Sequence, residues 1–176
     1  RSVYNSMTSR LLVDKIEGKT TASTVQMPAG MVIQTETLAR TRTARQTISS
    51  TSFVIINDGV GNFQLAITPK FASSKILGSV SLAGIATTTN ATSIGIKIYR
   101  DSTEIALLDS HFGYNSDEVG DRNHFSSPFF DSPNSTSSVT YSIYAAVQGG
   151  SQTAFFFDTH ISDNVTNTFI LQEVAQ

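Results

Sequence analysis

The feature that most constrains this chain is a regular alternation of residue types in short runs. The segment Val139–Val147 carries an apolar residue at every second position, and the shorter runs Phe63–Ile67 and Ile94–Ile98 do the same. A repeat of two places these side chains on one face of a β-strand. Turn residues such as Asp58-Gly59 and Gly149-Gly150 end the runs. Since no stretch shows the 3.6-residue period of an amphipathic helix, the sequence predicts an all-β fold.

About eight or nine such runs follow one another from Met31 onward. Their spacing and turn signals are typical of an antiparallel β-sandwich. Ser and Thr make up 46 of the 176 residues, which suits strands and turns better than helices. An immunoglobulin-like sandwich and a jelly roll both fit this pattern. We favour a jelly-roll-like β-sandwich over residues 31–176.

The first 30 residues follow a different pattern. Scattered apolar residues, among them Leu12 and Ile16, stand between Ser, Thr and Lys, and neither a helical nor a strand period persists. Such a segment buries too little surface by itself to offset its loss of conformational entropy. We therefore expect residues 1–30 to form an extended arm that packs on another molecule. A disordered terminus is the alternative.

Two segments depart from the alternation because they present apolar side chains to both faces of a strand. A sandwich strand with one wet face does not tolerate this pattern, so something must cover the second face. A loop or the arm could cover it in a monomer, and neighbouring copies could cover it in a homo-oligomer. We predict an oligomer interface at these two segments. Its residues are Phe155, Phe156, Phe157, Phe169, Ile170 and Leu171.

The charge balance excludes several classes of function. The 12 Lys and Arg residues nearly balance 14 Asp and Glu residues, so the chain lacks the basic surface that nucleic acids require. It also lacks a run of about 18 apolar residues, so we expect no membrane insertion. No nucleophile motif, cysteine or phosphate-binding loop stands out. We therefore predict a protein that is not an enzyme and needs no cofactor.

The longest loop, residues 110–123, contains the candidate binding residues. Phe112, Tyr114 and Asn115 could hold a neutral glycan, with a ring stacked on the sugar and polar groups bonding its hydroxyls. The alternative is that Phe112 attaches the loop to the core. The same region offers carboxylates and an imidazole, which suit a cation. These candidate metal ligands are Asp117, Glu118, Asp121 and His124, and the alternative is an ordinary polar loop.

A series of short motifs occurs along the chain in a defined order. They are Ile67-Thr68-Pro69, Ser73-Ser74-Lys75-Ile76-Leu77, Arg100-Asp101-Ser102-Thr103, Asp131-Ser132-Pro133, Thr140-Tyr141 and Leu171-Gln172-Glu173-Val174-Ala175. In this order they resemble a domain common in tailed-phage fibre proteins, notably those of marine phages. The segments Leu12–Ile16 and Met27–Gln34 are similar to the connector that precedes such domains. The chain departs from the family in having no long fibrous shaft.

The resemblance implies a subunit of a virion appendage, usually trimeric, with a jelly-roll-like tip and no catalytic residues. We therefore hypothesise a structural component of a phage particle, either a tail fibre, a head fibre or a decoration subunit. Residues 1–30 would attach it to neighbouring virion proteins, and the sandwich would recognise the host surface, including its glycans. The alternative is a secreted carbohydrate-binding or adhesive module, or a subunit of a surface filament.

Overall fold

The fold is all-β over the residues that the structure, a computed structural model, describes. The described residues are 28–41, 44–87, 92–114, 122–149, 151–158 and 166–176. The strands are β1 (Val32–Thr41), β2 (Gln46–Ile48), β3 (Val54–Ile55), β4 (Gln64–Ile67), β5 (Lys75–Thr87), β6 (Ile94–Arg100), β7 (Thr103–Phe112), β8 (Asn123–Asp131), β9 (Val139–Val147), β10 (Ala154–Phe156) and β11 (Thr166–Val174). In this part of the chain there is no apolar helix of the length that a membrane crossing requires.

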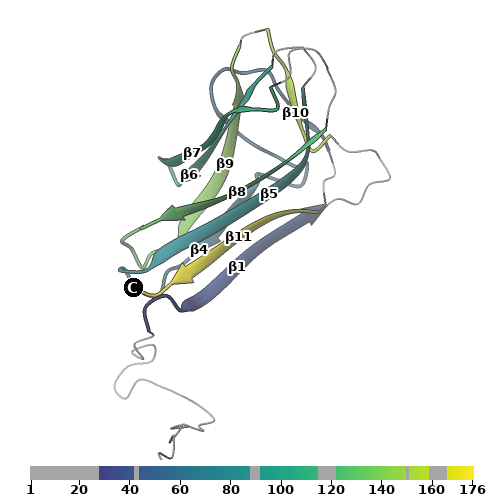
Figure 1. Ribbon diagram of the computed structural model, residues 1–176. Helices are drawn as coiled ribbons and strands as arrows, with labels where there is room; N and C mark the ends of the chain where they lie inside the picture. The colour runs from purple at the N-terminus through teal and green to yellow at the C-terminus, as the bar shows by residue number, and fades with distance from the viewer. Residues whose placement is uncertain (1–27, 42–43, 88–91, 115–121, 150, 159–165) are drawn as a thin grey trace, which may run out of the picture.

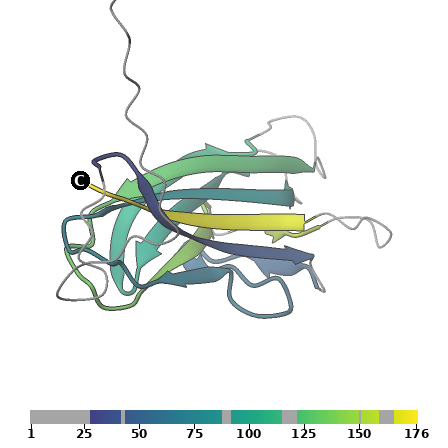
Figure 2. The ribbon, with the colours of Figure 1, turned by 90° about the horizontal axis from the view of Figure 1, so that it is seen from below.

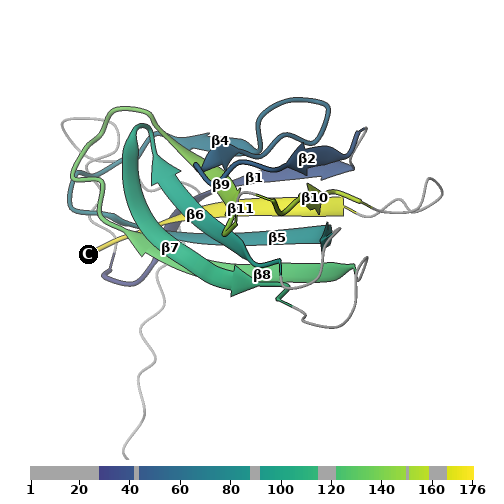
Figure 3. The same cartoon turned by 90° about the horizontal axis from the view of Figure 1, so that it is seen from above.

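The strands form two antiparallel sheets packed face to face (Figure 1). In one sheet β1, β11, β5 and β8 lie side by side, and β10 and β2 extend it beyond β5. In the other sheet β9 pairs with β4, β3 and β6, and β7 follows β6. Figures 2 and 3 look onto the two sheets from opposite sides.

The pairing of the long strands identifies the topology. When the short strands β2, β3 and β10 are set aside, the first strand pairs with the last (β1 with β11), and the second pairs with the second last (β4 with β9). The next pairs inward are β5 with β8 and β6 with β7. A long antiparallel ribbon rolled into two sheets gives this nested pairing, which defines a jelly roll. The jelly-roll prediction is therefore confirmed, and the immunoglobulin-like alternative is excluded.

Aromatic rings fill the space between the sheets. The rings of Phe63 and Phe169 stack with their centroids 6.2 Å apart, and Phe157 lies 5.9 Å from Phe63. On the other side of Phe169, the Phe129 ring lies 5.6 Å from the Tyr141 ring. All five side chains are buried. The core is therefore closed within one chain.

This core corrects the predicted oligomer interface. Phe156, Phe157, Phe169 and Leu171 are each 0 % exposed within the single chain, so they cannot contact another copy. Phe157 has a φ of +61°, an uncommon backbone conformation for a bulky residue. The chain turns there, and both Phe156 and Phe157 enter the core.

The two remaining residues of that prediction, Phe155 and Ile170, are partly exposed. The Arg45 guanidinium lies 3.8 Å from the centroid of the Phe155 ring and shields part of that ring from solvent. Ile170 lies on β11 between two buried residues, so its side chain points to the outside of the sheet. Of the six predicted residues, only Phe155 and Ile170 therefore still offer some surface on the sheet, and the Arg45 guanidinium lies over the ring of Phe155.

The described chain enters and leaves the sandwich at the same end (Figure 1). The Gly30 N–H donates to the Ala175 carbonyl at 2.9 Å, and the Ala175 N–H donates to the Met31 carbonyl, also at 2.9 Å. Gly30 has a φ of +84°, which suits the turn closed by the bond from the Met31 N–H to the Pro28 carbonyl. Residues 1–27 of the predicted arm lie outside the described residues, so the arm stays a prediction.

Candidate functional site

The outer surfaces of the two sheets differ in chemistry. On the sheet seen in Figure 2, the twelve central outward positions of β1, β11, β5 and β8 carry no charge, and we call them the uncharged face. The burial alternation and the strand register assign these positions. They are Thr35, Thr37, Ala39, Thr168, Ile170, Gln172, Leu77, Ser79, Ser81, Ser126, Pro128 and Phe130. The face therefore mixes hydroxyl and apolar groups, with Lys75 and His124 at two of its margins.

The other sheet, which lies toward the viewer in Figure 3, carries charged and aromatic side chains on its outer surface instead. The Lys97 ammonium donates to the Glu104 carboxylate at 2.7 Å and lies 4.3 Å from the centroid of the Phe53 ring. The Tyr99 and Tyr144 rings lie 4.5 Å apart. The hydrogen bond from Lys97 lowers the pKa of Glu104. The charges of Lys97 and Glu104 neutralise each other, and the two tyrosine rings contact each other. This surface can therefore stay exposed to water.

One corner of the uncharged face carries the most exposed ring of the described chain. The Phe130 side chain is 70 % exposed, although Phe129 beside it is 4 % exposed. Consecutive residues of a strand point to opposite faces, so β8 places one phenylalanine in the core and one in water. Met31 and Val32, 44 % and 47 % exposed, lie at the same end of the sandwich. We call the residues around this ring the Phe130 corner.

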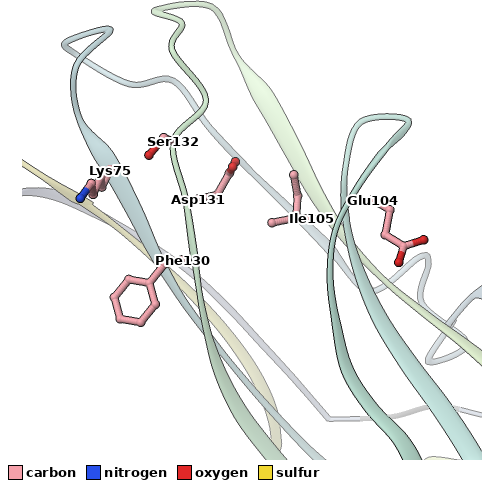
Figure 4. Close-up of a pocket in the computed structure, with 6 residues that line it drawn as sticks. All are labelled: Lys75, Glu104, Ile105, Phe130, Asp131 and Ser132. Carbon is pink, nitrogen blue, oxygen red and sulfur yellow. The ribbon is translucent and has the colours of Figure 1, made fainter.

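Two hollows share Phe130 and Lys75 in their linings. The first, of about 430 Å³, opens between β5, β7 and β8, and Figure 4 shows the side chains that line it. Its lining residues are Lys75, Glu104, Ile105, Phe130, Asp131 and Ser132. The second, of about 370 Å³, is mostly apolar. Its lining residues are Gly30, Val32, Lys75, Leu77, Phe130, Val174 and Gln176.

The polar hollow is braced by Asp131, which Figure 4 shows pointing from β8 toward β7. Its Oδ2 atom accepts hydrogen bonds from the Arg100 guanidinium at 2.5 Å and from the Tyr141 hydroxyl at 2.6 Å. Burial and the bond to Asp131 raise the pKa of Tyr141 far above its ordinary range. For Arg100, partial burial lowers the pKa, but the hydrogen bond to Asp131, the charge of Asp131 and smaller contributions from Tyr141 together raise the pKa. These contacts attach the end of β8 to β6 and β9.

Another buried carboxylate organises the loop between β4 and β5 at this end. Glu173 is 0 % exposed, and its Oε1 atom accepts hydrogen bonds from the backbone N–H groups of Lys70 and Phe71 at 2.8 and 3.2 Å. Its Oε2 atom accepts a bond of 2.7 Å from the Gln34 amide. The end of the sandwich that carries the Phe130 corner is therefore held by side chains from several strands.

The loop residues predicted to bind a glycan lie at the opposite end. Phe112 is partly buried, and its ring meets the buried Phe125 ring edge-to-face with centroids 5.3 Å apart. This contact favours the alternative in which Phe112 attaches the loop to the core. Tyr114 is 57 % exposed. Asn115 lies outside the described residues, so glycan binding at this loop stays a prediction.

The predicted metal ligands cannot be assembled from the described chain. Asp117, Glu118 and Asp121 lie outside the described residues. The fourth, His124, is exposed, and its Nε2 atom lies 2.8 Å from the Ser81 hydroxyl. No group of three or more His, Asp or Glu side chains gathers among the residues described. The ion site is therefore still only a sequence-based expectation.

Comparisons with known proteins give a partial structural likeness. No family model matches the sequence, and no curated protein matches it. Among solved structures, a chain of the infectious bursal disease virus Gt strain is similar with a TM-score of 0.43 and 14% identity, over 82% of this chain and 39% of that one. The subviral particle of VP2 from infectious bursal disease virus gives 0.41 and 11% identity, over 82% and 39%. The chain thus spans about two fifths of these proteins, and its assignment as a jelly roll depends on its own strand pairing.

Proposed function

We propose that this chain is a structural subunit of a virus particle, attached through residues 1–30. The observation that carries the proposal is the position of Gly30 and Ala175, bonded to each other at one end of a jelly roll with a closed core. If the arm joins the sandwich at this end, the opposite end, which carries Tyr114, remains free. The two ends are about 30 Å apart, since a strand of ten residues rises roughly 3.3 Å per residue. The ordered fibre-domain motifs support the same assignment.

In this arrangement the two ends have separate tasks. The arm end faces the particle and contacts neighbouring virion proteins. The far end presents the loop that begins at Phe112 to the host surface, where Tyr114 is available to stack on a sugar. The resemblance to phage fibre domains supports a trimer, as a tail fibre, a head fibre or a decoration subunit. We assign the chain a binding role and no catalytic step.

The test compares purified virus particles assembled with the full chain and with a variant that lacks residues 1–27. We expect the full chain to copurify with particles, and the shortened chain to stay in the soluble fraction. Circular dichroism of the soluble variant provides the control, because it must show an intact β-sandwich. A full chain that never enters particles would overturn the proposal.

A second candidate is a secreted module that binds carbohydrate. The polar hollow beside Phe130 favours it, because an exposed ring next to Lys75, Ser132 and the Asp131 carboxylate matches the apolar and hydroxyl faces of a sugar. Binding of an oligosaccharide array by the monomeric chain, lost in Phe130→Ala and kept without residues 1–27, would support this candidate. Absence of such binding excludes it.

A further inference from the structure

We infer that the uncharged face, with the Phe130 corner at its margin, lies against a second copy of this chain. The inference rests on the proposed function, since it specifies the surface through which a virion subunit would self-associate. It replaces the interface that the sequence predicted, because four of those six residues are enclosed in the core.

The first argument is the absence of charge. Leu77 stands opposite Phe130 across β5 and β8, and Ser79 lies between Pro128 and Ile170. The other sheet exposes Lys97 and Glu104 at comparable positions. Burying charged groups without partners costs several kcal/mol, whereas aliphatic groups are buried favourably and hydroxyl groups can be buried when they form hydrogen bonds across the contact. The uncharged face is therefore the sheet surface that another protein can cover at the lower desolvation free energy.

The second argument is hydrophobic exposure. Phe130 at 70 % and Val32 at 47 % flank an apolar hollow that Leu77 and Val174 also line. Monomeric proteins keep contiguous apolar patches small, and a larger patch marks a contact surface. Large aromatic side chains also contribute most to binding energy in protein interfaces. Phe130 is therefore the residue expected to contribute most to this contact.

The third argument concerns the identity of the partner. Four strands spaced ~4.8 Å apart, over nine residues of ~3.3 Å, give a flat area of roughly 570 Å². Specific interfaces bury about 600–1,000 Å² per partner, so the face comes near the lower end of that range. Apart from Lys75 at its margin, the face carries no charge, so it has little electrostatic preference for an acidic or basic partner. These properties favour a second copy.

The experiment measures the mass of the full chain in solution by sedimentation velocity at several concentrations. One chain weighs 19.0 kDa, and we expect a species of two or three times that mass. Phe130→Lys and Ser79→Lys each add a charge to the exposed face, where neither side chain contributes to the core. Each should raise the dissociation constant by at least about tenfold, because the interface must bury the ammonium group.

Leu107→Lys is the matched control. Leu107 is 50 % exposed on the other sheet, so the variant changes a similar apolar side chain outside the proposed contact. We expect it to keep the wild-type mass. A wild-type monomer at all concentrations would overturn the inference, and so would unchanged association of both face variants. The sedimentation measurement needs no virus, so failure of the particle assay would overturn the proposed function but not self-association. A monomer that still enters particles would overturn self-association but not the proposed function.

Discussion

At the scale of single residues, Gly78 decides how β8 packs. A Cβ atom built on Gly78 would lie 2.0 Å from the Phe129 ring, and the two residues are direct partners across β5 and β8. The ring occupies the space that a Cβ atom on Gly78 would take, and it contacts the rings of Tyr141 and Phe169. No other residue type leaves this space, so the glycine determines the position of a core aromatic.

We therefore expect Gly78→Ala to destabilise the protein. The methyl group displaces Phe129, and forcing extra volume into a packed core costs about 1–3 kcal/mol. Thermal unfolding followed by circular dichroism should show a clear fall in the melting temperature. Gly61→Ala is the control, because a Cβ there meets only the Arg40 guanidinium at 3.6 Å. Equal melting temperatures for the two variants would contradict this account of the core.

Tyr141 gives a prediction about alkaline pH. Its pKa in the folded state lies far above the ordinary 10.0, owing to burial and the bond to Asp131. Above pH 10 the unfolded chain releases this proton while the folded chain keeps it, so stability falls as the pH rises, by up to about 1.4 kcal/mol per pH unit. Below pH 10 this residue adds no pH dependence.

Tyr141→Phe tests that dependence. At pH 7 the variant should be less stable by about 1.5–3 kcal/mol, because it loses a hydrogen bond to a carboxylate. Urea unfolding at pH 7, 10 and 11 should show the gap to wild type narrowing above pH 10, because the variant has no proton to lose there. A gap that stays constant over this range would contradict the raised pKa of Tyr141.

At the scale of elements, β1 is an edge strand on which the closure of the sandwich depends. It pairs with β11 from Val32 to Thr41, and Leu38 packs against the core. Beyond β1, the described residues Pro28–Met31 only form a turn and bond to Ala175. The boundary of the folded unit should therefore fall just before β1.

Two truncations test this boundary. Removal of residues 1–27 should leave the melting temperature nearly unchanged, because β1 and its turn remain. Removal of residues 1–41 should prevent cooperative folding, because β11 keeps β5 but loses its other partner, β1, and the core loses Leu38. Thermal melts of both proteins check the prediction. A cooperative melt without β1 would show that the strand is dispensable, and a large loss from the shorter deletion would place the boundary earlier.

At the scale of the whole molecule, the jelly-roll topology places the first strand, β1, next to the last strand, β11. The first strand pairs with the last, so the chain enters and leaves at one end, and the long connections gather at the two ends of the roll. The same topology leaves β1, β11, β5 and β8 side by side in one broad sheet surface (Figure 2). Attachment, self-association and display can therefore occupy separate parts of one small domain.

Most of the strands can be predicted from the sequence alone, because an alternation of two residues is a local property that each strand carries in its own side chains. The long strand β9 and the all-β class follow from it directly. The location of the oligomer interface does not follow from the sequence. The prediction at Phe155–Phe157 required an unbroken strand, and the strand ends at Phe157, which has a positive φ.

Which apolar side chains stay exposed depends on how distant segments pack. Adjacent phenylalanines at positions 129 and 130 already signal one inward and one outward ring, but burial depends on which neighbouring strands and loops cover each face. Phe156 and Phe169 are covered by their own chain, and Phe130 is not. Cover is a property of contacts between distant segments, and no local pattern contains it.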